Sequence, residues 1–185
     1  MKKLSIIFSM LVVFAITVSA QNFAKKGCFE IGGDIGFSSQ TPVSNGNTGD
    51  ASTSFSLSSY TGYFIIDGFE IGFAPLSYTI YTPPSGSKYS TLSILAAPAY
   101  NFDLKSNIFP FIEGLFGYTA QTVGDNSASG FSYGARGGIK IILGENALIN
   151  AGIQYMLYTY NPEGADNRYG YNLLMINAGF AVYFN

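Results

Sequence analysis

The chain has few charged residues, no histidine, no tryptophan and a single cysteine among its 185 residues. Charged residues make up 11% of the sequence, well below the roughly 25% of a usual soluble domain. A chain this poor in charge has too little polar material to coat a soluble globule of its size. Its net charge of −2 also offers no basic surface for nucleic acid.

The missing histidine and the lone cysteine limit the chemistry. Without histidine there is no Ser-His-Asp or Cys-His nucleophile and no histidine ligand for a metal. Cys28 cannot form an intramolecular disulfide, because it has no second cysteine to pair with. We interpret it as a small residue of the first strand rather than a reactive thiol. The sequence therefore predicts no enzyme, no cofactor and no metal site.

What the chain has in abundance is aromatic residues and glycine, with 16 Phe, 14 Tyr and 22 Gly, a composition that favours an all-β protein. Its one long apolar run is at the start. Lys2 and Lys3 precede the apolar residues 4–18, and the small residues 18–20 resemble a cleavage site. This run is short for a transmembrane helix, which needs roughly 20 residues. We predict a cleaved signal peptide over residues 1–20 and one barrel domain over residues 21–185.

Apolar and polar residues alternate along eight segments of the exported part, as expected for strands with one apolar face. These segments are 28–37, 53–66, 69–81, 89–102, 108–121, 131–143, 147–160 and 171–185. In the last segment one face carries Ile176, Ala178, Phe180, Val182 and Phe184. The pattern of the third segment slips at Pro75, which predicts a β-bulge there.

The connections between these segments alternate in length. Polar loops are predicted over residues 38–52, 82–88, 122–130 and 161–170, and short turns over 67–68, 103–107 and 144–146. Asp67-Gly68 is a typical two-residue hairpin turn. An even number of strands joined in this way indicates an eight-stranded antiparallel up-and-down transmembrane β-barrel, with long external loops and short periplasmic turns.

All charged residues within the predicted strands lie on the face opposite the apolar one: Glu30, Asp34, Glu70, Glu113, Arg136 and Lys140. The rest of that face is mainly Gly, Ser, Ala, Asn and Tyr, and such small residues suit the narrow lumen of an eight-stranded barrel. The opposite face is rich in Phe, Ile, Leu and Tyr, which suits lipid. An exported soluble lipocalin-like ligand-binding barrel is the inverted alternative, but its outer surface would need many Lys and Glu residues.

Exposed aromatic residues are predicted in two bands, as at the two interfaces of a membrane. The band on the loop side comprises Phe37, Phe55, Tyr78, Phe131 and Tyr155. The band on the turn side comprises Phe29, Tyr63, Phe69, Tyr100, Phe102, Phe180 and Phe184.

The charged residues suggest a polar network inside the lumen. Counted from the turns, Glu113, Arg136, Gln154 and Asn177 fall at a similar depth on neighbouring strands. We hypothesise that Arg136 bridges Glu113 and an acid of the first strand, and that Lys140 pairs nearer the turns, because a buried charge is costly unless it is paired. A narrow ion path is the alternative, although side chains fill a lumen of eight strands.

Two pairs of carboxylates are weak candidates for catalysis or for metal binding. Glu30 and Asp34 are four residues apart on one strand, about 13 Å, which is too far for a paired acid–base mechanism. Glu163 and Asp166 in the last loop are candidates for a weak calcium site, but their spacing fits no twelve-residue calcium loop. We interpret that segment as a solvated loop.

Residues 55–67 (FSLSSYTGYFIID), 112–118 (IEGLFGY) and 179–184 (GFAVYF) give the chain a pattern that resembles the small outer-membrane β-barrels of Gram-negative bacteria. The likeness is to the OmpX and OmpA-transmembrane-domain type, and above all to the barrel domains common in Bacteroidetes. The resemblance implies a location in the outer membrane. It also implies that the barrel-assembly machinery recognises the last strand through Ile176, Ala178, Phe180, Val182 and Phe184. Asn185 after Phe184 is a one-residue departure from the family pattern.

We therefore expect a monomer in outer-membrane lipid, with a structural or surface-interaction role through four external loops that contact a ligand or protein. The first alternative is a narrow pore for ions or small apolar solutes. The second is the soluble ligand-binding barrel.

Overall fold

A computed structural model describes residues 23–40, 43–44, 47–48, 50–86, 88–124, 126–162 and 169–185. Within these ranges the strands are β1 (Phe29–Gln40), β2 (Val43–Ser44), β3 (Asn47–Thr48), β4 (Ser52–Ile66), β5 (Phe69–Thr82), β6 (Tyr89–Ala96), β7 (Ala99–Asn101), β8 (Ile108–Val123), β9 (Asn126–Ile142), β10 (Ala147–Pro162) and β11 (Tyr169–Phe184). No helix among the described residues is long and apolar enough to cross a membrane.

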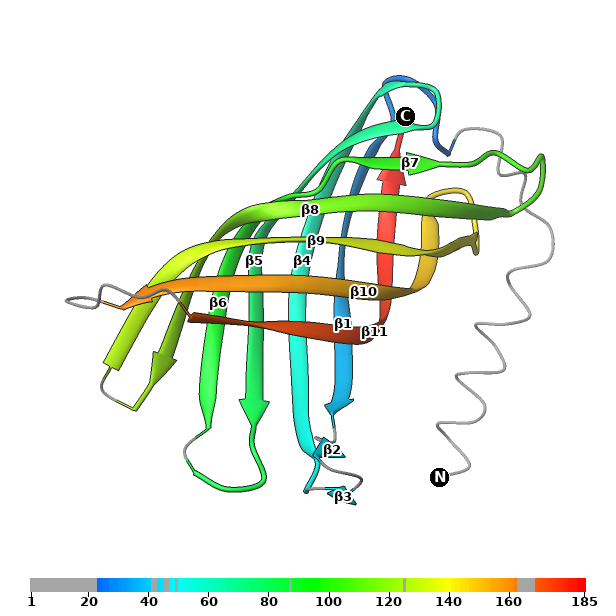
Figure 1. The fold of residues 1–185 in the computed structure, drawn as a ribbon. Coiled ribbons are helices and arrows are strands. Elements are labelled where there is room, and N and C mark those ends of the chain that lie inside the picture. Colours follow the sequence, from blue (N-terminus) through cyan, green and yellow to red (C-terminus); the bar gives the residue numbers. More distant parts are fainter. Residues whose placement is uncertain are drawn as a thin grey trace, which may run out of the picture.

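The strands close into one antiparallel barrel (Figure 1). β1 pairs with β11, from Phe29 opposite Phe184 to Phe37 opposite Ile176, and its other edge pairs with β4. From β4 onward each strand pairs with the next along the chain, except for β6 and β7, which do not pair with each other. β6 and β7 are two pieces of one barrel strand, since both lie between β5 and β8. This confirms the predicted eight-stranded up-and-down barrel. In Figure 1, β8, β9 and β10 cross steeply in front of β4 and β5, as tilted barrel strands do.

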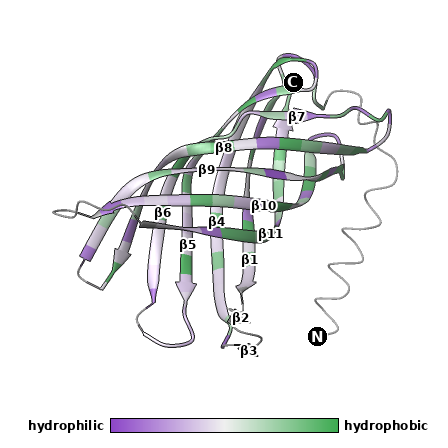
Figure 2. Cartoon of the chain, viewed as in Figure 1, coloured by the Kyte–Doolittle hydropathy of each residue, from purple (hydrophilic) through white to green (hydrophobic). Residues whose placement is uncertain are grey.

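Side chains alternate between the two surfaces of the barrel as predicted. On β11, Ile176 is 69% exposed, whereas its neighbours Met175 and Asn177 are each 2% exposed. Figure 2 shows hydrophobic and hydrophilic residues following one another along the strands instead of collecting at one end. Every barrel strand contributes large exposed apolar side chains, and the charged residues of the described strands are all buried. Of the aromatic residues predicted in two bands, all but the partly buried Phe69 are exposed.

Two predicted loops are shorter than the sequence suggests. The loop over residues 122–130 is wrong, because β8 runs to Val123 and pairs there with Asn126 of β9. The loop over residues 38–52 is wrong at both ends, because Gln40 of β1 still pairs with Ser52 of β4. Between β1 and β4 in the sequence, β2 and β3 pair with each other in a short antiparallel ladder. Small hydroxyl residues are typical of loops, but an extended hairpin also satisfies the backbone N–H and C=O groups of these segments.

The strand predicted over residues 89–102 is interrupted at Ala97 and Pro98, which separate β6 from β7. Pro98 explains the break, because proline has no backbone N–H to donate to the ladder. Backbone hydrogen bonds nevertheless continue to both neighbouring strands at this point. The Ala97 N–H donates to the Gly72 carbonyl at 2.8 Å, and the Pro98 carbonyl accepts from the Gly114 N–H at 2.9 Å.

The bulge predicted at Pro75 is confirmed. Between Phe73 and Ser77, β5 has one residue more than β4 has between Ser58 and Thr61, the residues opposite. The register of β5 with β6 shifts at the same place. The extra residue interrupts the alternation of β5 for one step, as the slip in the sequence pattern indicated.

Candidate functional site: the lumen of the barrel

The inward-facing side chains fill the lumen in three layers. The turn-side layer is apolar and consists of Phe23, Ala24, Cys28, Phe64, Phe109, Ile142, Leu148, Ala181 and Tyr183. The loop-side layer is also apolar and is built on Ala74, Leu95, Ala97, Leu115, Met156, Tyr158, Tyr160, Leu173 and Met175. Between them lies a charged layer made of the residues that the sequence placed inward. Both apolar layers therefore separate the charged layer from the openings of the barrel.

Residues 23–28, which we call the N-terminal strap, complete the turn-side layer. Phe23 is 1% exposed. Its ring packs edge-on against the rings of Phe64, Phe109 and Tyr183, with centroid distances of 5.5, 5.0 and 5.1 Å. Aromatic pairs in this geometry stabilise a core beyond the area they bury. The strap thus forms the floor of the lumen.

Polar contacts tie the strap to two turns at the same end of the barrel. The Lys26 N–H donates to the Asp67 carboxylate at 2.9 Å, and the Lys25 ammonium lies 3.4 Å from Asp67 and 3.5 Å from Asp103. The Lys26 hydrogen bond, with help from Lys25, lowers the pKa of Asp67 below its ordinary value. Cys28, predicted as the first residue of a strand, instead ends the strap and is buried.

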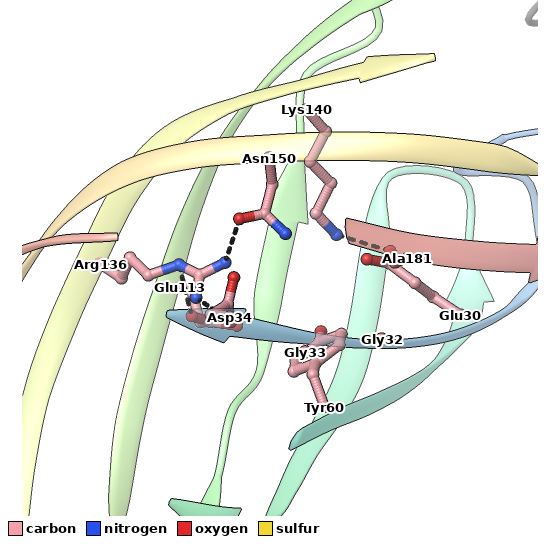
Figure 3. Close-up of a pocket in the computed structure, with 10 residues that line it drawn as sticks. All are labelled: Glu30, Gly32, Gly33, Asp34, Tyr60, Glu113, Arg136, Lys140, Asn150 and Ala181. Atoms are coloured by element: carbon pink, nitrogen blue, oxygen red, sulfur yellow. Dashed lines mark hydrogen bonds and ion pairs between the residues drawn. The ribbon is translucent and has the colours of Figure 1, made fainter. Parts of the chain in front are cut away.

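Arg136 is the centre of the first group in the charged layer (Figure 3). Its Nη1 lies 2.6 Å from Oδ2 of Asp34, and its Nε lies 3.4 Å from Oε2 of Glu113. Its Nη2 donates to Oδ1 of Asn150 at 3.3 Å. Arg136 and Glu113 face each other on β9 and β8, and Asp34 reaches them from β1. The guanidinium also lies 5.1 Å from the centre of the Phe111 ring, a distance typical of a cation–π contact.

Lys140 is the centre of the second group. Its Nζ lies 2.6 Å from Oε2 of Glu30 on β1 and 3.2 Å from Oε2 of Glu70 on β5. The Asn101 amide donates to the same Glu70 oxygen at 3.2 Å. The Phe23 ring centre lies 5.4 Å from Nζ, so the strap directly covers this ion pair. The charged residues of four strands, β1, β5, β8 and β9, are thus held in two adjacent groups.

Two residues predicted for the network lie outside these ion pairs. Gln154 faces Arg136 across β9 and β10 and is buried. Asn177 is also buried, and its Oδ1 has no hydrogen-bond partner. Counting residues from the turns places Gln154 level with Arg136, but Met175 and not Asn177 lies opposite Gln154 on β11. The count also does not show which long side chains reach across the lumen.

Sequence reasoning missed Asn101, Asn150 and the N-terminal strap. Asn150 could have been found, because it is the inward residue directly opposite Lys140 on β10. Asn101 faces inward beyond the break at Pro98. Phe23 carried no signal, since it precedes the first strand and has no periodic pattern around it.

A cavity of about 10 Å³ remains in the charged layer, lined by Glu30, Gly32, Gly33, Asp34, Tyr60, Glu113, Arg136, Lys140, Asn150 and Ala181. This volume is about that of one water molecule. Among the described residues, no three His, Cys, Asp or Glu side chains are arranged to hold a metal ion. The candidate calcium ligands Glu163 and Asp166 lie outside the described residues.

Tyrosines close the loop side of the lumen. The rings of Tyr158, Tyr160 and Tyr171 are stacked with interplanar angles of 3–25°. The Thr91 hydroxyl lies 3.2 Å from the hydroxyls of both Tyr160 and Tyr171. Tyr171 also contacts the rings of the stacked pair Tyr81 and Tyr89. This end of the lumen is therefore covered by interlocking side chains.

Two solved structures are similar to this chain. Neisserial surface protein A (NspA) matches with a TM-score of 0.65 and 20% sequence identity, over 86% of this chain and 100% of that chain. The outer membrane protein OprG from Pseudomonas aeruginosa matches with a TM-score of 0.58 and 17% identity, over 87% of this chain and 97% of that chain. No family model matches the sequence, and no curated protein matches it. At these identities the likeness is one of fold, that of a small membrane β-barrel.

Proposed function

We propose that the chain is an integral protein of the bacterial outer membrane, exported with a signal peptide over residues 1–20. Its closed barrel serves a structural or surface-interaction role. The barrel holds the connections at its loop end in contact with the outside of the cell. One correction to the sequence-based expectation follows from the fold: Val123 pairs with Asn126, so the third of the four connections is short. Contacts with a surface ligand or protein then fall mainly to the other three.

The observation that carries this proposal is the distribution of charge between the two surfaces of the barrel. In the described strands, every charged side chain lies in the lumen. Each barrel strand also exposes large apolar side chains on its outer surface, for example Phe116 on β8 and Ile153 on β10. A soluble monomer seldom exposes an apolar patch of more than a few hundred Å². Here the apolar surface surrounds the barrel, and acyl chains are the solvent that such a surface requires. Closure of β1 on β11 leaves no open strand edge in the lipid.

The filled lumen favours a structural or surface role over a pore. Two apolar layers enclose a charged layer whose cavity is about 10 Å³, and this is close to the volume of one water. Channels of this architecture need a continuous polar path, and side chains occupy that path here. We expect no single-channel steps when the purified protein is added to a planar lipid bilayer at high salt. Regular steps would support the narrow pore instead.

Membrane fractionation and gel mobility test the proposed location together. We expect the expressed protein to sediment with the outer membrane and to resist extraction at high pH. On a denaturing gel, the unboiled sample should migrate faster than the boiled one, because a closed barrel stays compact in detergent until it is heated. Recovery in the soluble periplasmic fraction, with one mobility before and after boiling, would favour the soluble lipocalin-like barrel.

We also propose that the assembly machinery recognises the outward face of β11, formed by Ile176, Ala178, Phe180, Val182 and Phe184. Replacing Phe180 and Phe184 together by Ser should reduce the amount of heat-modifiable protein in the outer membrane. The matched control is the double replacement of Phe116 and Phe131 by Ser. These aromatics are also exposed, but they lie on β8 and β9. Equal losses in both double variants would mean that apolar surface alone matters, without a special role for β11.

A further inference from the structure

A pocket lies in the outer wall of the barrel, near the loop end of β9 and β10. It has a volume of about 70 Å³ and is lined by Gly130, Phe131, Thr159, Tyr160 and Asn161. Tyr160 is buried on the lumen side, whereas Phe131 and Asn161 are exposed. The pocket therefore opens toward the surroundings of the barrel. A cavity of this volume has room for more than one water molecule, so a small group of a ligand can enter it.

The pocket coincides with an interruption of the β9–β10 ladder. The register with β9 is continuous as far as Tyr158 of β10 and resumes at Asn161. In this interval the Thr159 hydroxyl donates to the Phe131 carbonyl at 2.6 Å. Gly130 lies in the same interval, and a Cβ there would be 1.9 Å from the Thr159 carbonyl oxygen. A side chain thus bridges the two strands beside the pocket, which belongs to the folded wall.

The outer surface changes from apolar to polar at the level of this pocket. Phe131 is 69% exposed, and the Tyr118 ring on β8 lies beside it with the ring centroids 6.3 Å apart. Along β10 the outward side chains are apolar at Tyr155 and polar at Thr159 and Asn161. Exposed aromatic bands mark the interface between acyl chains and headgroups. The pocket therefore lies where the acyl chains of a lipid join its headgroup.

The polar groups of the pocket define the chemistry of a matching ligand. The Thr159 hydroxyl proton is engaged by the Phe131 carbonyl, so the hydroxyl oxygen offers its lone pairs to a donor. The Asn161 carboxamide is able to donate and to accept. The five lining residues carry no charge, so they supply no cation for a phosphate. A matching group is uncharged and has a donor as well as an acceptor, as an amide or a hydroxyl has.

We propose that this pocket binds the amide-linked hydroxyacyl group of a glycolipid in the outer leaflet. The inference rests on the proposed function, because that function places the loop end of the barrel at the cell surface. The ester linkages of a phospholipid only accept hydrogen bonds, and would leave the Thr159 oxygen without a donor. An amide-linked hydroxyacyl chain supplies an N–H or O–H to Thr159 and a carbonyl to the Asn161 amide. Its hydrocarbon part then lies against the Phe131 ring.

Native mass spectrometry of the barrel released from vesicles tests the proposal. The probes are a dephosphorylated glycolipid with amide-linked hydroxyacyl chains, and phosphatidylethanolamine with chains of the same length. The wild type should retain the glycolipid in preference to the phospholipid. Thr159→Val keeps the shape of the side chain but removes its oxygen, so glycolipid retention should fall roughly fivefold or more, as expected for one lost hydrogen bond. Thr159→Ser keeps the oxygen and should retain the glycolipid as the wild type does.

Thr53→Val is the matched control. Thr53 is exposed near the loop end of β4, and β1 and β11 separate that strand from β10. The control should leave glycolipid retention unchanged. Equal retention by Thr53→Val and Thr159→Val would overturn the proposal. If Thr159→Val reduces retention of phosphatidylethanolamine as strongly as that of the glycolipid, the pocket takes a lipid ester and the glycolipid assignment is wrong.

Gel mobility keeps a failure of this inference apart from a failure of the proposed function. Each variant should shift on heating as the wild type does, which shows that its barrel is folded. If Thr159→Val does not fold, Asn161→Leu should show the loss of glycolipid instead, because it leaves the hydrogen bond between Thr159 and Phe131 in place; unchanged retention would overturn the proposal. A wild type that sediments with the outer membrane but has no preference for the glycolipid overturns the inference alone. A soluble wild type overturns the proposed function.

Discussion

The outer surface and the lumen of this barrel are built from the same strands by the same alternation, yet they treat charge in opposite ways. The outer surface of the described strands carries no charged residue, and its large side chains are exposed. The lumen holds every strand charge, and each cation there lies 2.6 Å from a carboxylate. Charged side chains of the strands therefore occur only where an oppositely charged side chain lies within contact distance. The variants below test this contrast, beginning with the largest expected effect.

Removing a cation from the lumen should be the most damaging change. Arg136→Leu would leave Asp34 buried without its partner, and breaking a buried ion pair costs about 3–5 kcal/mol. Denaturant unfolding of the barrel in detergent or vesicles would measure the loss. The control is Lys105→Leu, since the Lys105 side chain is 81% exposed and its ion pair with Asp103 lies on the surface, where such pairs contribute little. An unchanged unfolding curve for Arg136→Leu would refute the paired lumen.

Opening the floor of the lumen should cost somewhat less. Phe23→Ala removes a buried ring that packs on Phe64, Phe109 and Tyr183, and truncating a buried Phe costs about 3 kcal/mol or more. It would also uncover Lys140, whose Nζ lies 5.4 Å from the ring centre. Unfolding should become easier, and hydrogen exchange of the backbone around Lys140 should become faster. Unchanged exchange in that region would mean that the strap does not seal the charged layer.

Placing a charge on the outer surface tests the other half of the comparison. Ile153 lies midway along β10 and is 59% exposed. Ile153→Lys should destabilise the barrel in lipid by about 2 kcal/mol or more, as cations near the bilayer midplane do. Thr122→Lys is the control, because Thr122 is exposed near the loop end of β8. Equal stability of the two variants in vesicles would argue against lipid at the middle of the outer surface.

The smallest effect is expected at the strap's surface anchor. The pKa of Asp67 is lowered by the Lys26 N–H and by Lys25, so its ionised form favours the folded state. This contribution to stability is fully present above the ordinary pKa of 3.8. It is lost as the pH falls through the lower pKa that Asp67 has in the folded state. Asp67→Asn should therefore melt slightly below the wild type near neutral pH and coincide with it at about pH 2. A difference that persists in acid would exclude this ionic origin.

Much of the fold could be predicted because alternation is a local property of the chain. It placed Glu30, Asp34 and Arg136 inward before their partners were known, and the slip at Pro75 indicated the bulge. Composition misled where small polar residues continue a hairpin, as at Thr122, which pairs with Ser127. Alternation also continues across Pro98, so it gave no sign of the break there.

The candidate site was predictable only in part. Inward position and depth follow from the pattern, so the sequence suggested that Arg136 joins Glu113 to an acid of the first strand. It could not separate Glu30 from Asp34 as partners, because that choice depends on how far each side chain reaches across the closed lumen. Phe23 was missed for a related reason: its ring packs on Phe64, Phe109 and Tyr183 from three different strands, and no periodic pattern in the sequence indicates that packing.

The central claim, that lipid covers the apolar surface and the lumen is closed, can be measured with single tryptophans. The chain has no Trp of its own. Phe116 and Phe111 both lie on β8, but Phe116 is exposed whereas Phe111 is buried in the lumen. In vesicles with brominated acyl chains, we predict strong fluorescence quenching for Phe116→Trp and little for Phe111→Trp. Quenching of Phe111→Trp alone, or of neither variant, would contradict this account.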